Sequence, residues 1–251
     1  MSATIFSVEH LSLSYPTAHG ERSVLRDISL SLACGQKLAL YAPNGSGKTS
    51  LLRCITGLLR PKAGTIFFHD KEIRKEADFQ KLRRKVGYVL QEASDQIFFP
   101  TVLEDIAFGP LNLGFSPKAA QAKAKEQLAK LGILSLKDRP THALSGGEKR
   151  MVALAGILAM EPEALLLDEP TTALDEEASQ KLLEILAKLP TARITVSHDL
   201  LFLSSVADTF YTIENQQLIN MPCPILHSHK HAHFGGEKAH SHIEAHYTPN
   251  V

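Results

Sequence analysis

Apolar and polar residues alternate near the start of the chain, most clearly over Val8–Tyr15 and Ile28–Leu32. This alternation is typical of strands with one buried face, so we expect short antiparallel strands that break at Pro16–Gly20. Lys37–Tyr41 is instead a short apolar run, and it predicts a strand that ends in a glycine-rich turn. Lys48–Leu59 then carries apolar residues at helical spacing, so a helix should follow that turn directly.

Strand and helix patterns continue to alternate along the rest of the chain. We expect further strands at Gly64–Phe68, Val86–Leu90, Ala164–Leu167 and Arg193–Ser197, and helices at Ser116–Ile133, Gly146–Met160 and Lys181–Leu189. Strands separated by helices favour a parallel sheet of the α/β class. Residues from Phe99 to Met160 show no strand pattern, so a helical insertion is expected at about 95–160.

The composition is that of a globular protein, with 44% hydrophobic and 22% charged residues in a chain of 251. Basic and acidic residues number 27 each, and the resulting zero net charge disfavours nucleic acid as a partner. The three cysteines form no CxxC pair, no signal peptide is evident, and the longest apolar run is too short to span a membrane. We therefore expect a soluble protein of the cytosol.

The turn after Lys37–Tyr41 contains most of a phosphate-binding motif. Asn44–Thr49 reads NGSGKT, the core of GxxxxGK[ST], with Ala42 in place of the first glycine. In such a loop the glycines turn backbone N–H groups toward one point, and the helix N-terminus adds positive potential. Lys48 supplies a full charge for the outer phosphates, and the Thr49 hydroxyl can complete the coordination of Mg²⁺. The alternative is an ordinary tight turn.

Two adjacent carboxylates follow the predicted buried strand Ala164–Leu167. Because neighbouring residues at a strand end point to opposite sides, Asp168 and Glu169 cannot do the same work. One can hold Mg²⁺ while the other faces the attacking water. Without the phosphate loop, a solvated acidic pair at the start of a loop would be the simpler interpretation.

The segment Leu144–Glu148, LSGGE, allows two interpretations. Ser145 and Glu148 have the spacing of a capping box, which would open the helix predicted from Gly146. However, two consecutive glycines each cost a helix about 1 kcal/mol relative to alanine. Their presence in the first turn indicates that another group must approach this backbone closely, as an anion does at a bare helix N-terminus.

Seven motifs occur in one order: Tyr15, the loop Ala42–Thr49, Gln91, LSGGE at Leu144–Glu148, LLLDEP at Leu165–Pro170, ALD at Ala173–Asp175 and SHD at Ser197–Asp199. This series resembles the ATP-binding subunits of ABC transporters over nearly the whole stretch from Thr4 to Asn220. The resemblance implies a P-loop ATPase core with a parallel sheet, an antiparallel N-terminal β subdomain and a helical insertion. It also implies a dimer, here expected to be a homodimer, that encloses two ATP molecules between its subunits.

The resemblance assigns roles residue by residue. The nucleotide contacts would be Tyr15, Ala42, Pro43, Asn44, Gly45, Ser46, Gly47, Lys48, Thr49, Ser50, Gln91 and, for the ATP held by the opposite subunit, Ser145, Gly146 and Gly147. Thr49, Gln91 and Asp168 would hold or position Mg²⁺. Glu169 would be the general base, His198 would contact the γ-phosphate, and Asp175 would lie near the seam of the dimer.

The segment after Gln91 resembles one particular group of ABC transporter ATPases. Asp95–Pro110 contains DQIFFPTV followed by EDIAFGP, which is similar to the ATPases of energy-coupling-factor importers of vitamins, cobalt or nickel. Phe98, Phe99 and Phe108 would then form a docking groove for integral membrane subunits. Alternatively, these phenylalanines fill the core of the helical insertion.

Residues 221–251 are dominated by proline, histidine, glycine and serine, and we expect a disordered tail. Seven of the twelve histidines lie here: His227, His229, His231, His233, His240, His242 and His246. Imidazole is largely neutral at cytosolic pH and binds nickel, cobalt, zinc and copper, so the tail is a candidate metal site. It could equally be a metal buffer or a dispensable extension.

These observations predict an ATPase, bound to the cytoplasmic face of the membrane, that energises import of nickel or cobalt through an energy-coupling-factor complex. Residues 1–220 would form the ATPase domain. The alternatives are a zinc or vitamin importer, or a soluble ABC protein that acts on ribosomes or DNA. The last class usually has two fused ATPase units or a long coiled coil, and this chain has neither.

Overall fold

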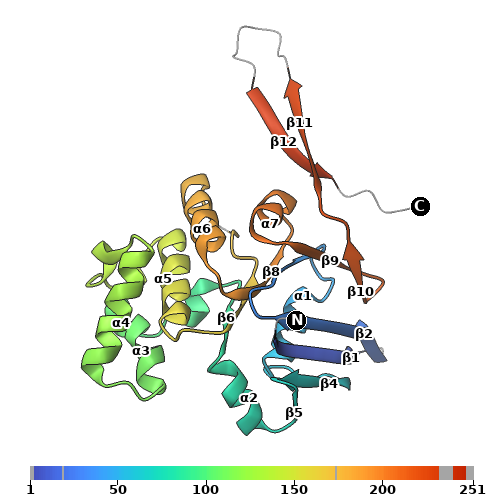
Figure 1. The fold of residues 1–251 in the computed structure, drawn as a ribbon, viewed down its shortest axis with the longest axis horizontal. Coiled ribbons are helices and arrows are strands. Elements are labelled where there is room, and N and C mark those ends of the chain that lie inside the picture. Colours follow the sequence, from blue (N-terminus) through green and yellow to red (C-terminus); the bar gives the residue numbers. More distant parts are fainter. Residues whose placement is uncertain (1–2, 19, 173, 232–239, 247–251) are drawn as a thin grey trace.

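The computed structural model describes residues 3–18, 20–172, 174–231 and 240–246, the last 14 strand residues (225–231 and 240–246) by their backbone. Its centre is a six-stranded sheet in the order β10-β9-β3-β8-β7-β6 (Figure 1). The strands are β3 (Lys37–Tyr41), β6 (Val86–Val89), β7 (Ala164–Asp168), β8 (Ala192–Ser197), β9 (Thr209–Glu214) and β10 (Gln217–Met221). All neighbours are parallel except β9 and β10. Every residue of β7 and β8 is buried, which explains their unalternated sequences.

A second, antiparallel sheet is built from the amino-terminal part of the chain, as predicted. Its order is β2-β1-β4-β5, with β1 (Thr4–Thr17), β2 (Gly20–Ala33), β4 (Ala63–Phe68) and β5 (Lys71–Ile73). The alternating apolar residues of β1 and β2 are the buried ones. Gly64 has a φ of +102°, and a Cβ there would lie 2.5 Å from the Cα of Leu11, so only glycine fits at this crossing.

The helices fall into two groups (Figure 1). Four helices lie around the sheets: α1 (Lys48–Ile55), α2 (Glu76–Arg83), α6 (Glu176–Lys188) and α7 (Leu200–Val206). The insertion contains α3 (Val102–Asn112), α4 (Pro117–Lys130) and α5 (Gly146–Leu158). Short 3₁₀ turns lie at Ala93–Gln96, Leu134–Leu136 and Thr141–Ala143. The insertion extends from one end of the central sheet and contains no strand, as the sequence predicted.

Helix boundaries differ most from the sequence-based expectation at two places, the end of α1 and the start of α6. Helix α1 ends at Ile55 rather than Leu59, because Gly57 turns at a φ of +71° where the Phe79 ring leaves no room for a Cβ. Helix α6 begins at Glu176, five residues before the predicted start. Its first turn is acidic and capped by Asp175, so the apolar spacing becomes visible only later in the helix.

The histidine-rich segment departs from the expectation of a tail without regular structure. Backbone pairing joins β11 (Ile225–His231) and β12 (His240–His246) in an antiparallel hairpin. The hairpin projects away from the body of the molecule beyond β10 (Figure 1). Alternation of histidine with other residues has the period of two that a strand requires, which accounts for strands here. His233 lies outside the described residues.

Candidate functional site

The loop between β3 and α1 leaves the N-terminus of α1 without a capping side chain. Gly45 and Gly47 have positive φ angles of 80° and 103°, and Gly47 is the N-cap residue of the helix. No side chain caps the first turn and none in it is acidic. The orphan N–H groups of a helix N-terminus are therefore available to an anion.

Lys48 places its charge at the centre of this loop. Its side chain is 6% exposed. The Nζ atom donates hydrogen bonds to the carbonyl oxygens of Ala42 and Pro43, and it lies 3.3 Å from Oε1 of Glu169. Ala42 is fully buried, so its methyl group sits behind the loop and its carbonyl still orients the lysine.

Asp168 joins α1 to the end of β7. Its Oδ1 accepts a hydrogen bond from the Thr49 hydroxyl at 3.1 Å, and its Oδ2 accepts one from the Tyr88 hydroxyl at 3.0 Å. Burial raises the pKa of Asp168 above its ordinary value, and burial beside this carboxylate also raises the pKa of Tyr88. A hydroxyl and a carboxylate at one point form the oxygen donor set that a hard divalent cation prefers.

Glu169 faces the other way, as the strand geometry predicted. Its backbone has a φ of +47°, outside the region favoured by side-chain-bearing residues. Its Oε2 lies 2.8 Å from Nδ1 of His198, whereas Oε1 has no hydrogen-bond partner and lies 3.3 Å from Nζ of Lys48. The two adjacent carboxylates thus have different partners: Asp168 binds two hydroxyl groups, and Glu169 contacts a histidine and a lysine.

A cleft of about 590 Å³ opens over this loop. It is lined by nine of the predicted residues, Tyr15, Asn44, Gly45, Gly47, Lys48, Thr49, Ser50, Gln91 and Glu169, and also by Thr17, Arg22 and Val24. Tyr15 and Ser50 share a hydrogen bond of 3.0 Å between their hydroxyl oxygens. Ser46 Oγ, at the bend of the loop, is buried without a hydrogen-bond partner, as a group that serves a ligand would be.

The LSGGE segment does not line this cleft. Ser145 caps α5 through the predicted reciprocal box: its hydroxyl accepts from the Glu148 N–H, and the Glu148 carboxylate accepts from the Ser145 N–H. A Cβ on Gly147 would lie 3.3 Å from Ala178, in the first turn of α6, whose N-cap is Asp175. The predicted residues Ser145, Gly147 and Asp175 therefore belong to neighbouring helix ends. Ala173 lies outside the described residues.

Arg150 is a site residue that the sequence analysis missed. Its side chain is buried in α5, and its guanidinium donates to the carbonyl oxygens of Leu90 at 2.8 Å and Gln91 at 2.6 Å, and to that of Thr172 at 3.2 Å. The insertion is thereby tied to the loops that follow β6 and β7. Arg150 ends the charged stretch Glu148–Arg150 at the start of α5, so nothing in the local sequence set it apart.

The aromatic residues of Asp95–Pro110 are not core residues of the insertion. Phe98 is 74% exposed and Phe108 is 41% exposed. The rings of Phe99 and Phe108 are in contact, tilted by 42° with their centroids 4.8 Å apart. Asp105 holds the turn by accepting from the N–H groups of Phe98 and Phe99, and burial raises its pKa.

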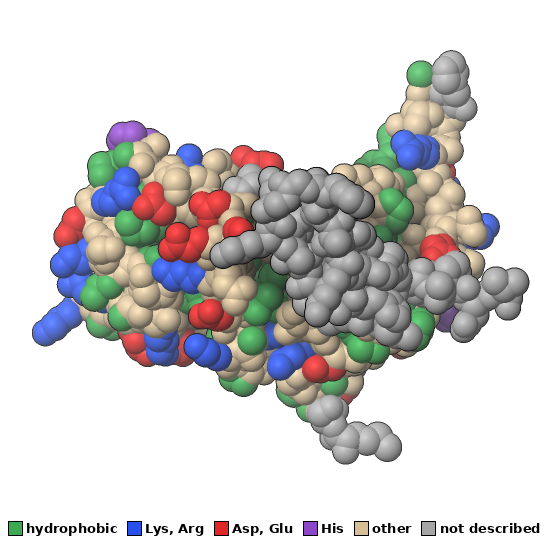
Figure 2. Space-filling model, turned by 90° about the horizontal axis from the view of Figure 1, so that it is seen from above, with side chains coloured by type: hydrophobic (Ala, Val, Ile, Leu, Met, Phe, Trp, Pro, Cys, Tyr) green, Lys and Arg blue, Asp and Glu red, His purple; other side chains and the backbone are tan. Residues whose placement is uncertain are grey.

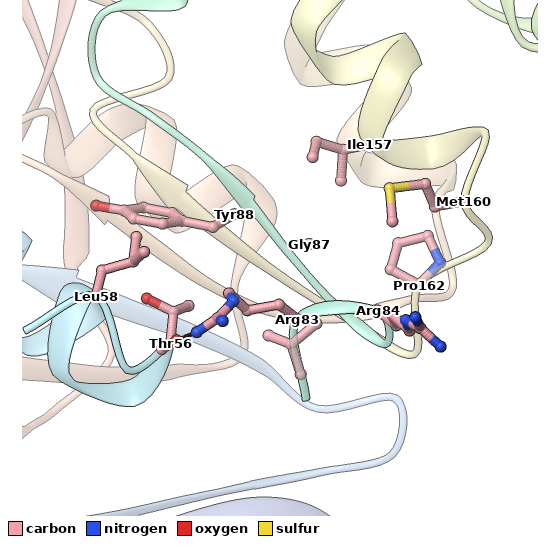
Figure 3. A pocket seen from close by; sticks show the side chains of 10 residues that line it. Thr56, Leu58, Arg83, Arg84, Gly87, Tyr88, Ile157, Met160 and Pro162 are labelled. Atoms are coloured by element: carbon pink, nitrogen blue, oxygen red, sulfur yellow. Dashed lines mark hydrogen bonds between the residues drawn. The ribbon is translucent and has the colours of Figure 1, made fainter. Parts of the chain in front are cut away.

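A small apolar groove of about 160 Å³ lies between the core and the insertion (Figure 3). Tyr88 and Leu58 line its core side, and Ile157, Met160 and Pro162 line the side of the insertion. Helix α3 packs against Met160, one of the lining residues, since a Cβ on Gly109 would lie 2.7 Å from its Cγ. Leu58 is 58% exposed at the rim.

Figure 2 shows one face of the molecule with its described side chains coloured by type. Acidic and basic side chains are interspersed there over the end of the molecule that carries the insertion. Among the described residues, no helix combines the length and apolar character needed to cross a membrane. No three histidine, cysteine or acidic side chains gather as metal ligands within the part of the chain whose side chains are described.

The geometry agrees with comparisons to known proteins. Residues 25–172, more than half of the chain, match the family model described as ABC transporter. A cobalt import ATP-binding protein of Rhodobacter capsulatus is 45% identical over 208 residues, which are 81% of this chain and 73% of that protein. An energy-coupling factor transporter ATP-binding protein of Methanothermobacter thermautotrophicus is 40% identical over 225 residues, 88% of this chain and 71% of its own length.

Solved structures give the same answer. The protein named cbiO1 of Clostridium perfringens, part of a cbiONQ complex, superposes with a TM-score of 0.76 at 32% identity, over 87% of this chain and 88% of that one. The α/β architecture with its P-loop is therefore confirmed. The chain belongs to the ABC transporter family and is one of its ATPase subunits, in which ATP hydrolysis is coupled to transport.

Proposed function

We propose that this ATPase energises the import of nickel or cobalt ions through an energy-coupling-factor membrane complex. The observation that carries the proposal is the 45% identity to a protein named for cobalt import, which extends over 81% of this chain. Relatives named for energy-coupling factor transporters support the complex type. The experiment below distinguishes nickel and cobalt from the alternative cargoes, zinc ions and vitamins.

The cleft suits ATP and Mg²⁺. The unpartnered Ser46 hydroxyl, the glycine loop and Lys48 suit a triphosphate, and Thr49 with Asp168 would hold the cation; Gln91, exposed at the cleft, would position it. When bound, ATP supplies the phosphoryl group, and Mg²⁺ neutralises its charge. Glu169 accepts the proton of the attacking water as general base. His198 steadies Oε2 of that carboxylate, and the other oxygen becomes available when Lys48 turns to phosphate.

Two copies of the chain would close over each nucleotide. In support, Ser145, Gly146 and Gly147 stand outside the cleft of their own chain, on a helix end beside Asp175 and α6. A helix N-terminus with two glycines can approach phosphate oxygens that its own loop does not hold. We propose a homodimer in which each α5 N-terminus completes the partner's site.

Integral membrane subunits would dock on the groove in Figure 3 and on the exposed Phe98 and Phe108 of the insertion. Phe98 and Leu58 expose large apolar side chains that a partner helix could cover. Tyr88 lines the groove and also bonds Asp168, so one side chain connects the docking surface to the nucleotide site. This arrangement would hold the chain at the cytoplasmic face of the membrane as a peripheral subunit.

The experiment is uptake of radioactive nickel and cobalt by cells that express this chain with its membrane subunits. We expect uptake with the unaltered chain and background levels with Glu169→Gln, which removes the base. Competition by excess zinc or by vitamins measures selectivity. Uptake of zinc or of a vitamin, with neither nickel nor cobalt entering, would contradict the proposed cargo. Equal uptake with Glu169→Gln would contradict the coupling of this ATPase to transport.

A further inference from the structure

The β11–β12 hairpin brings the histidines of the chain's end into a defined register. Backbone pairing places His229 opposite His242 and His231 opposite His240. The next position along the ladder places His227 opposite Glu244. Residues opposite one another in an antiparallel pair lie on the same face, and so do residues two apart in one strand.

One face of the hairpin therefore carries nearly all of its metal-ligating residues. The face comprises Ile225, His227, His229 and His231 on one strand and His240, His242, Glu244 and His246 on the other. The opposite face comprises Leu226, Ser228, Lys230, Ser241, Ile243 and Ala245, without a histidine or a carboxylate. The single lysine of the two strands, Lys230, thus belongs to the face away from the histidines.

The spacing of such a ladder matches the reach of imidazole ligands. Opposite residues have Cβ atoms about 5 Å apart, and residues two apart along a strand are separated by about 7 Å. Metal–nitrogen bonds of about 2 Å let imidazoles from adjacent rungs converge on one ion. Histidine is mostly neutral above its ordinary pKa of about 6.5, so no proton competes at cytosolic pH.

We propose that the hairpin is a binding site for a divalent first-row transition metal, with His229, His231, His240 and His242 as its four core ligands. His227 and His246 lie at the periphery, since their opposite residues are Glu244 and Ile225. Imidazole donors suit nickel, cobalt, zinc and copper, and affinity should follow the Irving–Williams order. The site stands apart from the nucleotide cleft, and it does not depend on which cargo the transporter carries.

The strand register allows a test that separates the effect of histidine position from the effect of histidine number. His229→Asn with His242→Asn removes one core rung, whereas His227→Asn with His246→Asn removes two histidines of the same face that do not oppose each other. Calorimetric titration of the full-length chain with nickel chloride and with zinc chloride measures affinity. We expect the core double variant to bind about tenfold or more weakly and the peripheral variant to stay within about threefold.

A third variant keeps the histidine count and moves one ligand to the other face. Ser228→His with His229→Ser exchanges two neighbours, and we expect it to weaken binding about as much as the core variant. Lowering the pH to about 5 should release the metal from the unaltered chain by protonating imidazole. Unchanged ATP affinity in every variant confirms that the ATPase domain is folded. Equal weakening in both double variants, or no effect of the exchange, would overturn the proposal, as would absence of binding by the unaltered chain.

Discussion

Two helices of this protein begin with glycines, and their N-termini are built in opposite ways. Helix α1 starts at a left-handed Gly47 with no capping side chain, no acidic residue in its first turn, and Lys48 as its first residue. Helix α5 starts at Ser145, whose cap is completed by Glu148 in a reciprocal pair of hydrogen bonds. The Ser145 N–H holds the pKa of Glu148 below its ordinary value, so that carboxylate stays charged.

Because of this difference, the N-terminus of α1 forms a complete anion site within one chain, whereas the N-terminus of α5 forms only half of one. At α1 the glycine loop and Lys48 of a single chain line one cleft. At α5 one helix N–H is already bonded to Ser145, and the negative Glu148 lies in the first turn. The N–H groups of Gly146 and Gly147 then need an anion whose charge is neutralised elsewhere. A triphosphate already held by another chain's lysine meets that requirement, which favours the two-chain arrangement.

Replacement of the base should give the largest effect. Glu169→Gln keeps the side-chain volume but cannot accept a proton, so we expect turnover to fall about 1000-fold while ATP still binds. Phosphate release and nucleotide titration measure the two quantities. Glu148→Gln is the matched control at α5, since glutamine also completes a capping box, and it should retain most activity. Comparable loss in the control would show that the α5 carboxylate takes part in the chemistry.

The two glycines should respond differently to alanine. At Gly47 the φ is +103° and a Cβ would meet Val24 at 2.8 Å, so Gly47→Ala should disrupt the loop and nucleotide binding together. At Gly147 a Cβ would lie 3.3 Å from the Cβ of Ala178, a tight contact that a shift of a few tenths of an ångström relieves, so Gly147→Ala should still fold and bind ATP. Its turnover should nevertheless fall about 100-fold, because the methyl group displaces the partner's phosphate. Normal turnover of Gly147→Ala would argue against close approach at α5.

Arg150 connects the two regions, and its loss should affect stability first. Lysine cannot reach three carbonyl oxygens at once, so Arg150→Lys leaves buried acceptors unpaired. We expect the free energy of unfolding to fall by about 3 kcal/mol in urea titrations, with a smaller loss of turnover. Arg84→Lys, at an exposed position, is the matched control and should change stability by less than about 0.5 kcal/mol. Equal unfolding free energies of the two variants would contradict the view that Arg150 holds the insertion to the loops after β6 and β7.

The sequence predicted the parts of the site that depend on local spacing. Lys37–Tyr41 and the start of α1 were predicted to the residue, because strand, glycine loop and helix follow one another without a gap. Tyr88 and Arg150 were not predicted, because their partners lie 80 and about 60 residues away along the chain. The end of α1 was misjudged for the same reason, since it depends on Phe79 packing against Gly57. Contacts between distant segments leave no local pattern.

The smallest expected change in stability concerns the buried carboxylate beside α1. Burial raises the pKa of Asp168, so the folded state holds this proton more tightly than the unfolded state does. Its contribution to stability is therefore full below the ordinary aspartate pKa and is lost as pH rises through the raised value. Asp168→Asn removes that loss, and its unfolding free energy at neutral pH should exceed that of the unaltered chain by about 1 kcal/mol.

Urea unfolding at several pH values checks the sign of this difference, which should shrink as the pH falls toward about 4. Magnesium-dependent turnover should be lost in the same variant, because the amide no longer offers the charged oxygen beside Thr49. The buried Asp168 beside α1 thus lowers stability at neutral pH but is needed for magnesium-dependent turnover. The α5 N-terminus, whose cap is complete, has no buried carboxylate whose replacement would raise stability. A variant less stable than the unaltered chain at neutral pH would mean that the Thr49 and Tyr88 hydrogen bonds outweigh desolvation at Asp168.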